Sequence, residues 1–208
     1  MAKELEKVAI ESAAELREWL SQNHSSSGSV WLVTWKKDSG HPYVSYDEIV
    51  DQCLCYGWVD SLPRKLDELR TMLRISPRSP KSNWSRVNKD RVSRLVREGL
   101  MEPRGLAIVE QAKKNGAWDF LDDVERLEVP EDLYLEFEKH PGSRRLFERF
   151  PPSSRRGILE WIKTAKTEVT RRKRIAETVR KAAVNRKANF PKGRDLGPED
   201  ELASDTAD

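Results

Sequence analysis

The chain has 208 residues, of which 37% are hydrophobic and 35% are charged, and its formal net charge is +3. This length suits one globular domain, or one domain with a helical appendage, and seven tryptophans supply apolar surface for a core. The amino-terminal residues lack the apolar region of a secretory signal, and no run of residues approaches membrane-spanning length. We therefore expect a cytoplasmic protein with no membrane insertion.

The charges are distributed unevenly along the chain. Residues 64–97 contain eleven Lys or Arg and three acids, residues 166–194 contain eleven and two, and residues 195–208 contain six acids and no cation. A basic protein with an acidic tail can bind polyanions, and the tail can compete for the same surface. An ordinary solvated surface explains the same pattern. Both interpretations stay open.

Two helices are predicted in the first third of the chain. Ser12-x-x-Glu15 is a capping box, in which a serine and a glutamate three residues later satisfy the first backbone N–H groups of a helix. Ser45-x-x-Glu48 is a second capping box, followed by apolar residues at helical spacing, and Gly57 ends that helix. Cys53 and Cys55 are two residues apart on this helix, so they face apart and suit neither a shared disulfide nor a shared metal.

Strands are predicted between and after these helices. Residues 29–37, 58–62 and 68–75 are rich in β-branched and aromatic side chains or alternate between apolar and polar ones. A short further strand is expected around Tyr43 and Val44. The fold class we predict is α+β, with a small, mainly antiparallel sheet flanked by helices and followed by a helical C-terminal part.

The remainder of the chain predicts helices. Glycines at 99 and 116 end two of them, and an acidic segment that closes on a proline, residues 121–130, marks a boundary. Beyond it we expect helices at Glu131–Lys139, at Ser143–Phe150 and from about Ser154 to about Lys187. The predicted organisation is an α+β domain with a ligand site at 1–120, a helical part at 121–190 and a disordered acidic tail at 191–208.

Most motifs that would define a reaction are absent from the sequence. The histidines at 24, 41 and 140 are scattered, so we expect no metal, and no cofactor-binding motif is present. Asp60 is a weak candidate for a general acid or base. It also suits a structural carboxylate that pairs with Arg74 or Arg78. Whether the protein is an enzyme is left uncertain.

The segment P-R-S-P-K-S-N-W-S-R-V-N at 77–88 is the one polar cluster that suggests a ligand. Arg78 offers a planar donor fork, Lys81 a point charge, and Trp84 a flat face on which a base or an apolar group can stack. Serines here can also cap the following helix while the tryptophan fills the core. The ligand-site prediction, for a small anionic or phosphate-bearing ligand, comprises Trp58, Asp60, Arg74, Arg78, Lys81, Ser82, Trp84, Ser85 and Asn88.

An alternative function uses the basic residues of the last predicted helix to bind nucleic acid. The candidate residues are Arg171, Arg172, Lys173, Arg174 and Lys181. Helical spacing predicts that positions 172, 176 and 179 pack, so that Arg171, Arg174 and Lys181 face outward. No aromatic residue lies between Lys163 and Ala188. We therefore expect any such binding to be weak and non-specific.

Several motifs in order resemble one family. They are C-L-C-Y-G-W-V-D-S, L-R-I-S-P-R-S-P-K-S-N-W-S-R-V-N, R-E-G-L-M-E-P-R-G-L and E-W-I-K-T-A-K-T-E-V-T-R-R-K-R-I. From about Glu15 to about Val184 the chain looks like the YdeI/OmpD-associated, or bacteriocin-protection, family. The resemblance implies a stress-resistance protein and carries no catalytic role. It also groups Trp58 and Asp60 with the segment 78–88 as one site, to which the helix motif at 165–171 is a possible addition.

Overall fold

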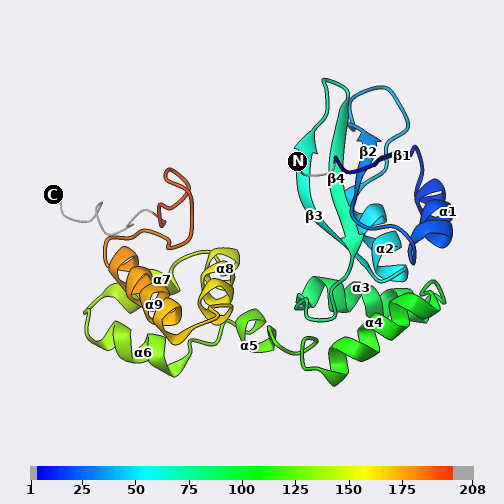
Figure 1. Cartoon of the computed structure of the whole chain (residues 1–208). Helices are drawn as coiled ribbons and strands as arrows, with labels where there is room; N and C mark the ends of the chain where they lie inside the picture. The colour runs from blue at the N-terminus through cyan, green and yellow to red at the C-terminus, as the bar shows by residue number, and fades with distance from the viewer. Residues whose placement is uncertain (1–3, 199–208) are drawn as a thin grey trace. The chain divides into compact units, whose positions relative to one another are not determined.

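The computed structural model describes residues 4–198, which form two compact units (Figure 1). The first unit ends at Phe120 and the second begins at Leu121. Each unit buries apolar side chains of its own. The predicted α+β class with a helical C-terminal part is confirmed.

The described N-terminal unit contains a four-stranded sheet and four helices. In chain order these are β1 (Lys7–Ala9), α1 (Ala13–Asn23), β2 (Val30–Trp35), α2 (Tyr46–Cys55), β3 (Trp58–Lys65), β4 (Arg70–Pro77), α3 (Arg86–Arg97) and α4 (Pro103–Lys114). The capping boxes begin helices as predicted. Ser45 and Glu48 cap α2 reciprocally, whereas at α1 Ser12 accepts the Glu15 N–H and the Glu15 carboxylate accepts the N–H of Glu11.

The strand order of the sheet is β1-β2-β4-β3. β1 runs parallel to β2, and the other two pairs are antiparallel, so the prediction of a mainly antiparallel sheet is confirmed. The strand expected around Tyr43 and Val44 is wrong. Those residues form no strand, because β1 and β4 already occupy both edges of β2, and Val44 is instead buried in the core.

One face of the sheet packs against α1 and α2 and forms the core of the unit. Leu32 and Ile75 project from this face, and Leu20 and Val50 meet them from the helices, each 4% exposed or less. Burying a side chain of this size contributes about 1.5–3 kcal/mol to folding. The hydrophobic effect therefore fixes which face of each strand is turned toward the helices.

Two glycines allow α2, β3 and α4 to approach closely. Gly57 has a φ of +70°, the left-handed conformation that a glycine adopts without strain, and it turns the chain from α2 into β3. Gly105 lies in α4 where a Cβ atom would collide with the carbonyl oxygen of Cys55. The N–H of Glu102 donates to that same oxygen over 3.1 Å. The start of α4 is therefore packed directly on the backbone that ends α2.

The described C-terminal unit is helical. It contains α5 (Asp122–Glu125), α6 (Glu131–Glu138), α7 (Ser143–Glu148), α8 (Pro152–Lys163) and α9 (Glu168–Ala182). The single helix predicted from about Ser154 to about Lys187 is wrong, because the chain breaks between α8 and α9. Thr167 adopts an extended conformation there, and its hydroxyl accepts the Thr170 N–H as the N-cap of α9.

Residues 191–198, predicted to belong to a disordered tail, pack onto the end of this unit. Leu196 forms a β-bridge with Arg186, and Asp195 is buried, with Arg186 3.1 Å away. The ion pair between Asp195 and Arg186 thus holds a segment that has too few apolar residues to pack through the hydrophobic effect alone. Residues 199–208 of the predicted acidic tail lie outside the described residues. None of the helices in the described chain has both the length and the apolar character needed to cross a bilayer.

We predict that Gly105→Ala lowers the free energy of unfolding by about 1–3 kcal/mol, because its methyl group overpacks the contact with Cys55. Urea denaturation followed by tryptophan fluorescence measures the change. Gly28→Ala is the matched control in the same unit, since a Cβ there meets no atom within 4 Å. Equal stabilities of the two variants would show that α4 can move away from α2 at no cost.

Candidate functional site

The segment 78–88 connects β4 to α3 through local hydrogen bonds. The N–H of Arg78 donates to the Gly57 carbonyl over 2.9 Å, and the N–H of Ser82 donates to the Ser79 carbonyl over 2.9 Å. Ser85 is the N-cap of α3, and its hydroxyl accepts the Asn88 N–H over 3.4 Å. Of the predicted ligand residues, Ser85 and Asn88 are therefore engaged in capping, while Ser82 helps to form the turn.

Trp84 is buried, with 2% of its surface exposed. The guanidinium of Arg78 lies 3.7 Å from the centroid of its ring, and the Trp118 ring lies 5.0 Å away, tilted by 47°. The prediction that Trp84 offers a free stacking face is wrong, because these neighbours and the core surround it. Trp84 holds Arg78 in place instead.

Arg78 is the most unusual group of the segment. It is 4% exposed, its Nη2 donates to the Asn83 carbonyl over 2.6 Å, and its Nε and Nη1 have no hydrogen-bond partner in the described part of the chain. Burial lowers the pKa of this guanidinium to about 10, although the negative charge of Asp60 opposes the shift. Each buried donor without a partner costs about 1–3 kcal/mol. Buried donors without a partner are rare in proteins, and they mark either a functional role or a place where another molecule supplies the acceptor.

Asp60 lies on the helix-facing side of the sheet. It pairs with Ile75 across β3 and β4, and its carboxylate accepts the Tyr46 hydroxyl over 2.8 Å. Burial and the nearby Asp60 raise the pKa of Tyr46 to about 12, so this hydroxyl stays a donor at neutral pH. The negative charge of Asp60 therefore acts on Arg78, although the two side chains form no ion pair within the described chain.

Two predicted ligand residues are not available to such a site. Arg74 neighbours Ile75 in β4 and so points to the opposite face of the sheet, where it donates to the Ser29 hydroxyl over 3.2 Å. The expectation that Arg74 faces Asp60 is wrong for this reason. Trp58 is 1% exposed, donates through Nε1 to the His24 carbonyl and packs edge-on against Trp19, so it belongs to the core.

A depression beside the segment gives it a solvent-facing side. Its volume is about 360 Å³, and its lining residues are Lys81, Asn83, Asn115, Gly116, Ala117 and Phe120. Lys81 is exposed and has no carboxylate within ion-pair distance among the described residues. Asn115 fixes the turn by donating to the Pro80 carbonyl over 2.7 Å. The depression thus combines one solvent-exposed cation, Lys81, with the amide side chains of Asn83 and Asn115.

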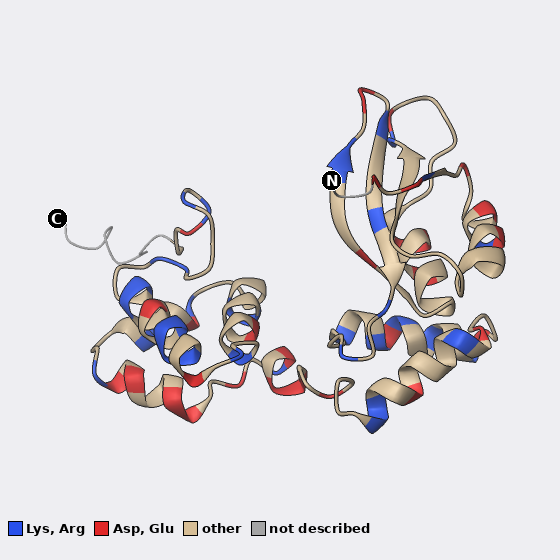
Figure 2. Ribbon diagram, in the orientation of Figure 1, with Lys and Arg blue, Asp and Glu red and all other residues tan. Residues whose placement is uncertain are grey.

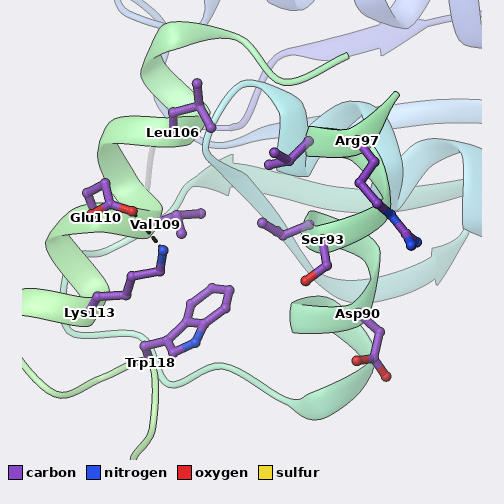
Figure 3. Close-up of a pocket in the computed structure, with 10 residues that line it drawn as sticks. Asp90, Ser93, Arg97, Leu106, Val109, Glu110, Lys113 and Trp118 are labelled. Carbon is purple, nitrogen blue, oxygen red and sulfur yellow. Dashed lines mark hydrogen bonds and ion pairs between the residues drawn. The ribbon is translucent and has the colours of Figure 1, made fainter. Parts of the chain in front are cut away.

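A larger groove of about 740 Å³ lies between α3 and α4 (Figure 3). Val109 and Leu106 of α4 and the ring of Trp118 line it, while Arg97 stands at its α3 side and Lys113 at its α4 side. The ammonium of Lys113 is 5.7 Å from the Trp118 ring. Sequence reasoning missed Trp118, whose only signal is an isolated tryptophan just after the turn at Gly116.

The basic residues of α9 are mostly engaged within the C-terminal unit. Arg171 binds Asp132 through two hydrogen bonds of 2.6 and 2.8 Å, and Arg172 binds Glu168 over 2.9 Å. Arg174 donates to the Trp161 carbonyl and lies over that ring. Lys181 lies 3.9 Å from both Glu177 and Asp195, and Lys173 is exposed. Four of the five candidate cations are therefore compensated by nearby groups.

The predicted packing of α9 also needs correction. The buried positions are 175, 178, 179 and 182, whereas 172 and 176 are exposed. Because α9 begins anew after the break at Thr167, its buried positions do not continue the helical spacing of α8. A prediction made for one long helix therefore assigns the wrong positions to the buried face.

Arg171 lines a separate cavity of about 210 Å³ within this unit, next to Lys163, which binds Asp123 over 2.6 Å. In the described chain no three His, Cys, Asp or Glu side chains are grouped to hold a metal ion.

The fold therefore defines a protein of two units, in which an α+β unit is followed by a helical unit. Residues 126–185 match the family described as Bacteriocin-protection, YdeI or OmpD-Associated, which confirms the resemblance for this part of the chain. Residues 8–108 match a separate model, described as Domain of unknown function (DUF8412). The motifs of the N-terminal unit therefore lie outside the segment that matches the bacteriocin-protection family. No curated protein and no solved structure matches the chain.

We predict that Asp132→Asn destabilises the C-terminal unit by about 1 kcal/mol at neutral pH. The hydrogen bonds from Arg171 lower the pKa of Asp132, so their stabilisation is present above the pKa of the unfolded chain and is lost as pH falls through the folded-state pKa. Hydrogen exchange of α6 and α9 should show a difference at pH 7 that shrinks below pH ~4. Glu138→Gln, at the exposed end of α6, is the control; a pH-independent loss would contradict the assignment.

Proposed function

We propose that this protein contributes to bacteriocin protection or a related stress response in the cytoplasm by binding a small anionic or phosphate-bearing ligand. The match of residues 126–185 supports the first part. The ligand site we propose is the depression lined by Lys81 and Asn83, and the Asn83 backbone carbonyl accepts a hydrogen bond from Arg78. The buried guanidinium of Arg78, with two donors unpartnered, is the observation that carries the proposal.

Arg78 suits this role because its charge is poorly screened. Among residues 4–198 no carboxylate pairs with it, burial removes it from water, and its lowered pKa still keeps it cationic at neutral pH. A charge in such a low-dielectric position acts over several ångströms more strongly than one in solvent. Its Nη2 donates to the backbone carbonyl of Asn83, a residue that lines the depression, which supports a link between this charge and the site.

Lys81 supplies the direct contact in this proposal. Its ammonium is exposed at the rim, and the amides of Asn83 and Asn115 line the same depression. Ammonium and amide N–H groups are donors that phosphate and carboxylate oxygens accept. The depression of about 360 Å³ is large enough for a phosphate group with a small organic substituent. Binding, rather than a chemical step, is what these groups support.

The first test is calorimetric titration of the full chain with inorganic phosphate, pyrophosphate and a nucleoside monophosphate. We expect Lys81→Ala to weaken the affinity about 10-fold, equivalent to roughly 1.4 kcal/mol for a lost charge-assisted hydrogen bond. Lys37→Ala is the charge-matched control on an exposed turn of the same unit. Equal losses in both variants, or no binding of any of these anions by the unchanged protein, would refute the proposal.

The second test concerns Arg78 itself. We predict that Arg78→Met abolishes anion binding and leaves the free energy of unfolding unchanged or raises it by about 1 kcal/mol, because an uncompensated buried charge is replaced by an apolar side chain. Chemical denaturation measures the stability and the same titration measures the binding. A large loss of stability with normal anion binding would show that Arg78 serves only the fold.

A further inference from the structure

The outer face of the sheet, turned away from α1 and α2, carries a row of aromatic and cationic side chains. The strand registers place Trp31, Trp35, Arg70 and Arg74 on this face, with Arg64 of β3 beside them. In the described part of the N-terminal unit, the helices lie on the other side of the sheet or at its lower end (Figure 1). Lysine and arginine positions are visible along β3 and β4 in Figure 2.

The apolar residues of this face are shielded by its own long side chains. Val33 and Met72 are 5% and 4% exposed, yet neither belongs to the core cluster between the sheet and the helices. Trp31 and Trp35 are half-buried next to them. Arg64 lies over the Trp31 ring at 6.0 Å and Arg70 lies over the Trp35 ring at 5.7 Å. The face is therefore an aromatic layer under a layer of guanidinium groups.

The charge on this face is compensated at one end only. Around Trp35, Arg70 binds Asp67 over 2.7 Å and the indole N–H donates to Glu11 over 3.0 Å. Around Trp31, Arg64 and Arg74 have no acidic partner within 4.0 Å among the described residues, and Arg74 bonds only to the neutral Ser29 hydroxyl. The Trp31 end thus presents two uncompensated guanidinium groups beside one indole.

We propose that the Trp31 end of this face binds single-stranded nucleic acid. One base stacks on the Trp31 ring and displaces Arg64 from its distance of 6.0 Å, while Arg64 and Arg74 contact the flanking phosphates. A flat sheet that presents an aromatic ring between cations is the arrangement with which single strands are bound without sequence readout. The two charges match the repeating phosphates of such a strand.

The same features argue against other occupants of this face. A duplex hides its base faces in the stack, so the indole would contribute nothing to its binding. An acidic peptide would satisfy the arginines and leave Trp31 without a partner of complementary shape. On α9, by contrast, most of the cations are already paired. The sheet face therefore offers the stacking surface that α9 lacks.

The test is fluorescence anisotropy of the full chain with labelled oligo(dT), oligo(U) and a duplex of equal length. We expect both single strands to bind at least 10-fold more tightly than the duplex. Arg64→Gln combined with Arg74→Gln should weaken single-strand binding about 10-fold or more and reduce the slope of log affinity against log salt by about 1.4. Trp31→Leu should weaken it by a similar factor, and Trp31→Phe should restore most of the loss because the ring is retained.

The matched control is Arg172→Gln combined with Lys173→Gln, which removes the same charge from exposed positions of α9. This control should leave single-strand affinity within about 2-fold of the unchanged protein, and thermal denaturation should show that all variants are folded. The proposal is overturned if the two double variants lose affinity equally, if the duplex binds as tightly as the single strands, or if polyglutamate competes as well as oligo(dT). Absence of measurable binding overturns it as well.

Discussion

β4 exchanges backbone hydrogen bonds with a neighbour on each of its edges, β2 on one side and β3 on the other. Because side chains alternate along a strand, this double pairing sends Ile75 into the core and Arg74 to the outer face. It carries Asp60 inward with Ile75 and Trp31 outward with Arg74. A register shift of one residue would exchange these faces, bury two arginines and expose the core. The hydrophobic core therefore also determines which charged groups can meet a ligand.

The end of β4 explains the burial of Arg78. The strand ends at Pro77. The N–H of the next residue, Arg78, donates to the Gly57 carbonyl, and its guanidinium packs on the Trp84 ring, so the side chain stays buried. The contact with an indole ring offsets part of the cost of desolvating a guanidinium, by about 2 kcal/mol in a desolvated site. Two of its donors have no acceptor among the residues that the structure describes. Stability alone does not favour such an arrangement, and strained or unpartnered groups of this kind are common where a protein binds something.

The sequence was sufficient to predict elements that depend on local chemistry. The capping box at Ser45, the glycine turn at Gly57 and the alternation in β4 were all predictable, because each depends on residues close along the chain. β1 was not, since three residues are too few to show a pattern and the pairing partner is distant in sequence. The single long helix failed because a threonine N-cap within a helical pattern is a weak signal.

For the candidate site, the sequence singled out a polar segment but could not show how its side chains are oriented. Polar composition drew attention to residues 78–88, of which Lys81 is exposed and lines the depression while Arg78 is buried. Trp58 and Trp84 are in the core and Arg74 is on the far face, because orientation depends on strand register rather than on composition. The outer-face tryptophans lay in a segment that was predicted correctly as a strand. Their partners Arg64 and Arg74 came from other strands, so their juxtaposition required the tertiary structure.

The boundary between Phe120 and Leu121 bears on how the two units of the chain are related to known families. Residues 8–108 and 126–185 match two separate models, and this border falls between them. Segments that bury their own apolar residues can be joined, exchanged or lost by recombination without exposing a core. The segment that matches the bacteriocin-protection model therefore lies in a unit with a core of its own, apart from the sheet unit that matches the other model. A function implied by the match of residues 126–185 therefore does not extend by itself to the sheet unit.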